Sequence, residues 1–261
     1  MHPDISRIPS RLFYGGRLAD GDNMATKTRQ IWHQSNLLGT YRFFNVALGS
    51  QENAQAGHSL INRAECDAAL GIYEVFLREY RSVDMAGRVG IISMYKAQIG
   101  ALKRAFEGRY GASIIGKIDF NTVDGFQGQE KDIIILSCVR AGHGVMSVGF
   151  LKDQRRLNVS ITRSRSSLFI LGHADTLQRS DETWKTIVED ARDRGVLVDV
   201  RTPPLIATVT LTFARSTARR LPKAPCRSVH HLPPDHLVPQ QHPFVLHRPR
   251  TLQLSQMQLL L

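Results

Sequence analysis

The sequence has 261 residues, of which 42% are apolar and 22% charged, a composition typical of a globular protein with a buried core. The formal net charge is +11, and residues 201–261, with seven Arg, one Lys and one Asp, carry +7 of it. A basic balance favours an anionic partner, most commonly nucleic acid. Three cysteines without a CxxC pair indicate neither a disulfide framework nor a zinc site. No apolar run is long enough to span a membrane, so we expect an intracellular protein, in the nucleus or the cytoplasm, without a membrane partner.

Residues 1–200 alternate between strand and helix patterns. We predict strands at 40–48, 88–94, 118–123, 132–139, 168–172 and 196–200, and helices at 63–81, 96–109, 154–163 and from 181 to 195. Continuous apolar runs such as 133–136 suit strands buried on both faces. The alternation predicts an α/β fold, a mostly parallel sheet with helices on both faces. Residues 22–38 lack a pattern, and we expect an exposed loop there.

The segment 201–261 has a different character and forms a separate unit in our division of the chain. It holds nine of the eleven prolines and five of the ten histidines. Proline at this density opposes both helix and sheet, so we expect a disordered tail. Its histidines could bind a metal, but nothing fixes their geometry, and we predict no metal site.

A glycine-punctuated loop, TVDGFQGQEKD at 122–132, leads into an apolar strand. Gly125 and Gly128 allow the backbone to turn sharply and to approach a ligand without a Cβ in the way. Open α/β sheets bind ligands in loops that follow the carboxyl ends of buried strands. The alternative is an ordinary strand connection with turn glycines.

An arginine-dense helix, RRLNVSITRSR, follows at 155–165. Arg156 and Arg163 are seven residues apart, which predicts a shared helix face. Guanidinium groups bind phosphate oxygens through two parallel hydrogen bonds and keep their charge. The alternative is a solvated cationic face.

A third segment, GIISMYKAQ at 90–98, places Tyr95, Lys96 and Gln98 where a predicted strand ends. These side chains could contact a phosphate backbone or a nucleotide. For Lys96, a solvated helix start is an equal alternative.

Together with the opening MHPDISRIPSRLFYGGRLADG, these segments resemble motifs of the superfamily 1 helicases, closest to the senataxin and up-frameshift branch. That branch typically shows TVDGFQG-x-E-KD, RRLNVA-x-TRAR and IGVITPYKAQ. This chain differs at Ser164, where Ala is usual, and at Ser93, Met94 and Ile8, where Thr, Pro and Phe are usual. The resemblance implies that residues 1–200 are the second, C-terminal RecA-like domain, of the P-loop NTPase type.

The resemblance also implies residue roles. Arg163 would reach the γ-phosphate of ATP as an arginine finger, with Arg156 as a second catalytic candidate. Glu130 and Gly128 would also bind the nucleotide. The residues expected to grip nucleic acid are Thr122, Gly125, Gln127, Tyr95, Lys96 and Gln98.

The sequence contains no GxxxxGK[ST] and no acidic apolar strand that could hold magnesium. The resemblance places both in a first RecA-like domain upstream of Met1, which would share ATP and magnesium with this chain, so a truncated gene model is one explanation. We therefore expect half of an ATP-dependent helicase or translocase on single-stranded RNA, in preference to DNA, inactive alone. The alternative is a non-enzymatic nucleic-acid-binding module or a helicase remnant.

Overall fold

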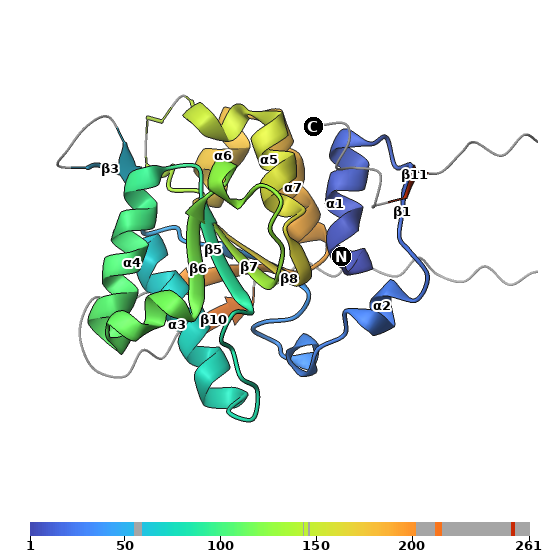
Figure 1. Ribbon diagram of the computed structural model, residues 1–261. Coiled ribbons are helices and arrows are strands. Elements are labelled where there is room, and N and C mark those ends of the chain that lie inside the picture. Colours follow the sequence, from blue (N-terminus) through green and yellow to red (C-terminus); the bar gives the residue numbers. More distant parts are fainter. Residues whose placement is uncertain (55–58, 143, 146, 202–211, 216–251, 254–261) are drawn as a thin grey trace, which may run out of the picture.

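The computed structural model describes residues 1–54, 59–142, 144–145, 147–201, 212–215 and 252–253. Its centre is a seven-stranded sheet in the order β10-β9-β2-β8-β7-β5-β6 (Figure 1). Neighbouring strands are parallel except β9 and β10, which are antiparallel. The predicted mostly parallel sheet is therefore confirmed. The strands are β2 (Tyr41–Asn45), β5 (Val89–Ser93), β6 (Ile118–Thr122), β7 (Lys131–Ser137), β8 (Ser164–Gly172), β9 (Leu197–Arg201) and β10 (Thr212–Arg215).

Helices cover both faces of this sheet, as expected for a RecA-like α/β fold. In β7, Ile133 and Ile135 belong to one core cluster and Ile134 and Leu136 to the other, because successive side chains of a strand point to opposite faces. The first cluster lies under α3 (Arg63–Glu79) and α4 (Lys96–Tyr110). The second lies under α1 (Pro3–Phe13), α5 (Gln154–Ile161) and α7 (Glu182–Asp193), on the opposite side in Figure 1.

The remaining elements are short. Two small sheets pair β1 (Leu18–Ala19) with β11 (Leu252–Gln253), and β3 (Glu52–Asn53) with β4 (Leu60–Ile61). The short helices are α2 (Met24–Lys27), α6 (Ala174–Ser180) and the 3-10 turns η1 (Ile31–Gln34), η2 (Ala112–Gly116), η3 (Asp124–Phe126) and η4 (Gly149–Lys152).

The main helices begin at side chains that accept hydrogen bonds from free backbone N–H groups. Asn62 accepts from the Glu65 N–H at 3.2 Å at the start of α3. Asp153 accepts from two N–H groups of the first turn of α5, and Asp181 does the same for α7. Such caps favour the helix by about 1 kcal/mol each. Helix α7 ends just before Gly195, whose φ of +63° lies in the left-handed region.

The first forty residues contain one helix that was not predicted and one segment for which the expectation is wrong. Helix α1 was not predicted, although Pro3 at its first position and buried Ile5 and Ile8 are compatible with one. Residues 22–38 are not an exposed loop, because Trp32 is fully buried. Its ring lies 5.3 Å from that of Phe76, and its Nε1 donates to Ser167 Oγ at 2.9 Å. One aromatic in an irregular segment produces no period that sequence reasoning could detect.

Within 201–261 the structure describes β10 and β11, two exceptions to the expected lack of regular structure. The rest of the predicted tail lies outside the described residues, and the division between residues 200 and 201 stays a prediction. Among the described helices, none combines the length and the apolar character that crossing a lipid bilayer requires.

Candidate functional site

The glycine loop crosses the sheet along the direction of the strands. It runs from the edge where the parallel strands end, called here the carboxyl edge, to the edge where they begin, called the amino edge. Strand β5 lies between β6 and β7, and all three strands are parallel. Residues 123–130 must therefore return from the carboxyl end of β6 to the amino end of β7 over β5. Phe126 is buried along this path, and a Cβ at Gly90 of β5 would lie 2.8 Å from its ring. The two ends of the loop thus reach opposite edges of the sheet.

The turn at the carboxyl end of β6 is shaped by Asn121 and Thr122. Asn121 Nδ2 donates to the Gly125 carbonyl at 2.9 Å, and the Gly125 N–H donates to Thr122 Oγ1 at 3.2 Å. A Cβ at Gly125 would lie 2.3 Å from Asn121 Oδ1, so only glycine fits. Gly128 has a φ of +82°, which favours glycine for its conformation. Gly125, Gln127 and Gly128 are exposed, so their backbone is accessible to a ligand.

Arg163 does not share a helix face with Arg156, because α5 ends at Ile161 and Arg163 lies beyond it. Its Nε donates to the Val159 carbonyl at 3.0 Å, and its Nη2 donates to Thr162 Oγ1 at 2.9 Å. The residue is only 8% exposed. Its guanidinium nevertheless makes no ion pair within 4.0 Å with any carboxylate in the described part of the chain. A desolvated cation with this arrangement suits an anionic ligand.

Glu130 lies beside Arg163 at the amino edge of the sheet. Lys131 of β7 and Ser164 of β8 are register partners, so the residues that precede them are neighbours. The Lys131 N–H also donates to the Arg163 carbonyl at 3.1 Å. Burial lowers the pKa of the Arg163 guanidinium, while the Glu130 carboxylate raises it. Glu130 itself is exposed and forms a 3.5 Å ion pair with Arg165.

Arg156 belongs to the other edge. Helix α5 runs from the carboxyl edge of the sheet to the amino edge, and seven helical residues span about 10 Å. Its Nε donates to Asp124 Oδ1 at 3.0 Å, and its Nη2 lies 2.9 Å from Asp124 Oδ2. The two predicted catalytic arginines therefore lie at different edges of the sheet. Arg163 lies beside Glu130, whereas Arg156 forms an ion pair with Asp124 of the glycine loop.

The three candidates after β5 differ sharply in accessibility. Lys96 is exposed at the first position of α4. Tyr95 is almost buried, and its hydroxyl donates to the Val148 carbonyl at 3.4 Å. Gln98 is fully buried, so the prediction that it contacts nucleic acid is wrong. Its Nε2 donates to the Asn62 carbonyl and to Ser137 Oγ, both at 3.0 Å, which makes it part of the interior.

The structure also shows a carboxylate, Glu65, whose burial and distant partners sequence reasoning missed. Glu65 is fully buried and accepts hydrogen bonds from Ser137 Oγ at 2.6 Å and from the Val139 N–H at 2.9 Å. Asn62 Nδ2 donates to the Val139 carbonyl at 3.1 Å. Val139 has a φ of +69°, a strained conformation for a β-branched residue. Burial raises the pKa of Glu65 to about 8. The sequence did contain a signal, because the helical spacing of Glu65, Ala68 and Ala69 places the carboxylate on the same buried face of α3 as the two alanines.

This network fixes the backbone at Val139, just after the end of β7. Glu65 lies in the first turn of α3 and Asn62 caps that helix, whereas Val139 lies 74 residues beyond Glu65. A buried carboxylate with several donors fixes the turn because an unbonded backbone N–H there would be costly.

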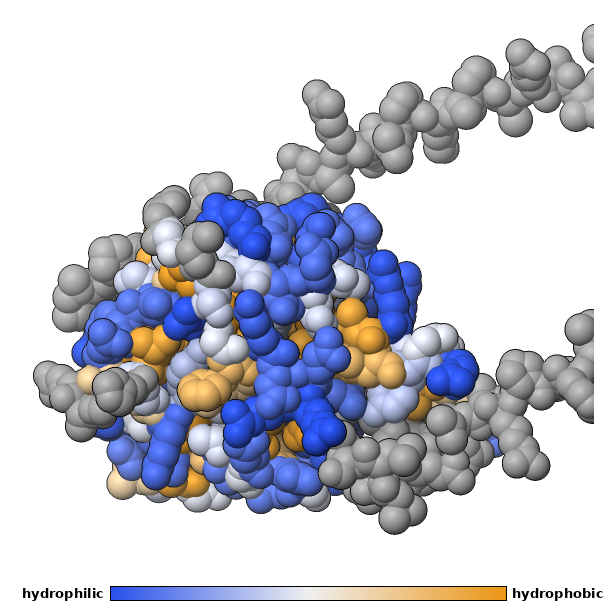
Figure 2. All heavy atoms as spheres, turned by 90° about the horizontal axis from the view of Figure 1, so that it is seen from above, coloured by the Kyte–Doolittle hydropathy of each residue, from blue (hydrophilic) through white to orange (hydrophobic). Residues whose placement is uncertain are grey.

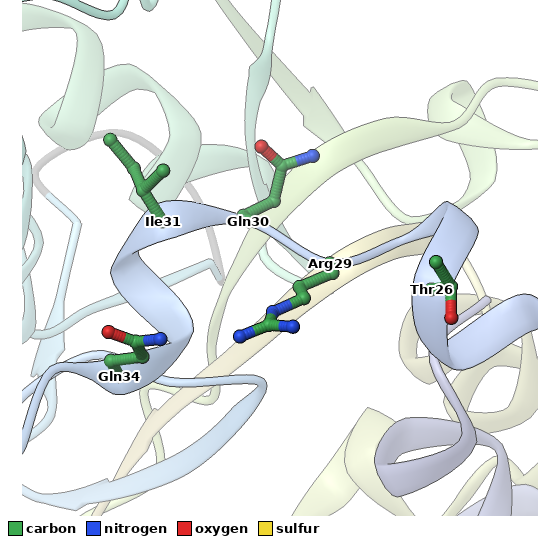
Figure 3. A pocket seen from close by; sticks show the side chains of 5 residues that line it. All are labelled: Thr26, Arg29, Gln30, Ile31 and Gln34. Atoms are coloured by element: carbon green, nitrogen blue, oxygen red, sulfur yellow. The ribbon is translucent and has the colours of Figure 1, made fainter.

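A pocket around α2 and η1 is lined by Thr26, Arg29, Gln30, Ile31 and Gln34 (Figure 3). Gln30 Oε1 also accepts from Arg88 Nη2 at 3.0 Å. None of the predicted site residues lines this pocket. Among the described residues there is also no group of three His, Cys, Asp or Glu side chains placed to bind a metal ion.

Comparison with known proteins matches residues 1–175 to a family described as an AAA domain. The chain is 43% identical over 222 residues to Helicase sen1 of Schizosaccharomyces pombe, covering 85% of this chain and 13% of that protein. It is 44% identical over 198 residues to Helicase SEN1 of Saccharomyces cerevisiae, covering 76% of this chain and 9% of that protein.

A third relative, Probable helicase senataxin of Mus musculus, is 34% identical over 208 residues, which are 78% of this chain and 7% of that protein. The chain thus spans about a tenth of the length of these relatives. The matched residues include the glycine loop and the arginine segment. The chain therefore belongs to this AAA domain family and, within it, to the superfamily 1 helicases of the senataxin and up-frameshift branch.

Proposed function

We propose that this chain is the second RecA-like domain of an ATP-dependent helicase or translocase that moves along single-stranded nucleic acid inside the cell. The observation that supports this most strongly is the glycine loop, which joins two surfaces at opposite edges of the sheet. Arg163 and Glu130 lie at one edge. At the other edge lie Thr122, the last residue of β6, and Gly125 and Lys96, which follow the ends of β6 and β5. A loop of this kind can couple the occupancy of one surface to the geometry of the other.

At the amino edge, Arg163, Glu130 and Gly128 would hold ATP. Arg163 carries a guanidinium that is desolvated, and no carboxylate in the described part of the chain pairs with it, so the site fits a phosphate. Bound ATP with magnesium would supply the phosphoanhydride bond whose hydrolysis drives movement. Arg163 would donate hydrogen bonds to the γ-phosphate oxygens and stabilise the charge that develops there. Glu130 would accept a hydrogen bond from a ribose hydroxyl.

The first RecA-like domain would supply the phosphate-binding loop and the magnesium ligands, so we propose that this chain alone does not hydrolyse ATP. The absence of GxxxxGK[ST] from the sequence supports this division of labour. The two domains would approach each other when ATP binds between them and separate after hydrolysis.

At the carboxyl edge, exposed backbone of the glycine loop and the Lys96 ammonium would contact the phosphates of the nucleic acid. Thr122 shapes the turn through its hydroxyl, and Gln127 would connect the two surfaces. The preference for RNA over DNA rests on the resemblance alone. RNA and DNA oligomers of the same sequence, compared for ATPase stimulation, test it.

The proposal is tested by ATPase measurements on the two-domain protein with saturating single-stranded RNA. Arg163→Ala should reduce the rate at least about tenfold, because arginine fingers contribute about 10³–10⁵ in related hydrolases. Arg179→Ala is the control, since Arg179 is an exposed arginine of α6, which carries none of the proposed site residues. An unchanged rate in Arg163→Ala, with the fold intact, would refute the proposed role.

A non-enzymatic nucleic-acid-binding module is the second candidate, favoured by the net charge of +11. Binding by charge alone weakens steeply with salt and does not depend on nucleotide. For the two-domain protein, an affinity for single-stranded RNA that changes with ATP, ADP or no nucleotide supports the helicase domain. The same affinity in all three states, without ATPase activity, supports the module.

A further inference from the structure

Phe150 is an exposed aromatic side chain that the family motifs leave without a role. Four large hydrophobic side chains are exposed in the described part of the chain, and three of them, Ile31, Leu48 and Leu77, are aliphatic. Phe150, in η4, is 57% exposed. Exposing an aromatic ring to water has a cost that a ligand with an apolar face can remove.

The backbone next to Phe150 is fixed by the packing and hydrogen bonding of its buried neighbours. The next residue, Leu151, is fully buried, and its carbonyl accepts a hydrogen bond from Trp184 Nε1 at 2.9 Å. The ring of Tyr95 lies 5.8 Å from that of Phe150, at an interplanar angle of 57°. Tyr95 is itself almost buried and hydrogen-bonded to the Val148 carbonyl. The Phe150 ring therefore lies beside a fixed aromatic residue, while more than half of Phe150 remains exposed to solvent.

Charged side chains surround Phe150, and they include the carboxylates of Asp124 and Asp153, which both pair with Arg156. The Arg156 guanidinium lies 5.8 Å from the centre of its ring, and Asp124 fixes that guanidinium by two contacts. Lys152 and Arg155, close in sequence, are exposed. An aromatic ring among arginine and lysine side chains is the arrangement with which proteins bind the bases and phosphates of single strands.

The location agrees with this chemistry. Phe150 follows β7 by way of the turn at Val139, and Arg156 joins η4 to the start of the glycine loop. Figure 2 views the molecule from above Figure 1, from the end towards which β6 runs, and hydrophilic and hydrophobic side chains are interspersed there. A strand held by the backbone of the glycine loop would lie beside this ring.

We propose that Phe150 is a stacking platform for one base of the bound single-stranded nucleic acid, with Arg156 beside it to contact a phosphate. This inference rests on the proposed nucleic-acid function and adds a subsite to it. Stacking tolerates any base, because every base has an aromatic face, so the subsite adds affinity without sequence preference.

The test measures equilibrium binding of the full chain to two fluorescent oligonucleotides of equal length, oligo-uridine and its abasic counterpart. Wild type should prefer the oligomer that carries bases. Phe150→Ala and Phe150→Leu should weaken binding of oligo-uridine about 5- to 100-fold and leave the abasic oligomer unaffected. Leu77→Ala, at an exposed leucine of α3, is the matched control and should change neither affinity. Unaltered thermal unfolding of the variants shows that the fold is kept.

Phe150→Trp provides a direct readout. It should retain binding, and its added indole fluorescence should be quenched by oligo-uridine and not by the abasic oligomer. The native Trp32 and Trp184 are fully buried and form a constant background.

Three results would overturn the inference, and they differ in what else they affect. Wild-type affinity for oligo-uridine in Phe150→Ala refutes the stacking role and leaves the proposed function intact. Unchanged RNA binding combined with loss of assembly with the first RecA-like domain would make Phe150 a domain contact instead. No binding of either oligomer by the wild-type chain or by the two-domain protein would refute the nucleic-acid function together with the subsite.

Discussion

Arg156 and Asp124 are joined by two contacts, from Nε to Oδ1 at 3.0 Å and from Nη2 to Oδ2 at 2.9 Å. This fork geometry is the strong form of an arginine–carboxylate pair. One partner belongs to α5 and the other to η3, so the pair connects the arginine segment to the glycine loop. It also holds the guanidinium near the Phe150 ring. Both partners reach solvent, which suggests that the pair orients the loop rather than stabilising the fold.

A double-mutant cycle with Asp124→Ala and Arg156→Ala tests that distinction. Exposed ion pairs contribute less than about 1 kcal/mol, because solvent screens the charges. We therefore expect a coupling energy below about 1 kcal/mol in urea unfolding. The exposed Arg63–Glu52 pair serves as the reference. A coupling energy above about 2 kcal/mol would show that the pair supports the fold itself.

Glu65 should make stability depend on pH. Its pKa is raised by burial from 4.5 to about 8, so the folded protein keeps a proton that the unfolded chain releases. The free energy of unfolding contributed by this group therefore falls as pH rises from about 4.5 to about 8, by a few kcal/mol at most. Glu65→Gln should lose this dependence. Wild type should be more stable relative to the variant at pH 5 than at pH 8.

The comparison with the variant is needed because other groups titrate in the same range. Burial lowers the pKa of His33 to about 4, and this group acts in the opposite direction, adding stability as pH rises. Subtracting the free energy of unfolding of Glu65→Gln from that of wild type at each pH removes the contribution of His33, which both proteins share. A difference between wild type and Glu65→Gln that stays constant from pH 5 to pH 8 would contradict the account of Glu65.

The sequence alone predicted the layered fold because its main signals are local. The apolar run of β7 can be recognised within a few residues of sequence. The role of Glu65 could not be predicted, since its meaning depends on the Val139 N–H, which is 74 residues away in the chain. Gln98 was misassigned for the same reason, because its partners Asn62 and Ser137 are brought to it only by the sheet and α3.

The site was predictable in its residue types and less so in its geometry. Sequence spacing suggested one face for Arg156 and Arg163, on the assumption that the helix continues to residue 163. The observed helix ends at Ile161, and the Arg163 side chain folds back to the Val159 carbonyl. The separation of Arg156 from Arg163 is therefore a property of a helix end, which residue spacing does not specify.

Ser164→Ala should stabilise the protein. The Ser164 hydroxyl is buried and has no hydrogen-bond partner among the described residues. Removing a buried polar group without a partner is expected to raise the free energy of unfolding by about 1 kcal/mol. Ser160→Ala is the matched control, because the Ser160 hydroxyl donates to the Leu157 carbonyl at 2.7 Å. That control should destabilise; if both variants destabilise equally, Ser164 has a partner that the geometry does not reveal.

Gly125→Ala should damage the glycine loop. The added Cβ would lie 2.3 Å from Asn121 Oδ1, so the turn after β6 must open. We expect a loss of about 1–3 kcal/mol in unfolding free energy and weaker binding of single-stranded RNA. Gly108→Ala, at an exposed position of α4 where a Cβ meets nothing within 4 Å, should instead stabilise by about 1 kcal/mol. Equal effects of the two substitutions would show that Gly125 is not sterically required.

The most direct measurement of the nucleotide site is a structure of the two-domain protein with a non-hydrolysable ATP analogue. The account predicts an Arg163 guanidinium nitrogen about 3 Å from a γ-phosphate oxygen, with the Glu130 carboxylate on the ribose side of the same nucleotide. A γ-phosphate bound with the Arg163 side chain still buried and out of its reach, or a nucleotide on a surface that excludes Glu130, would contradict it.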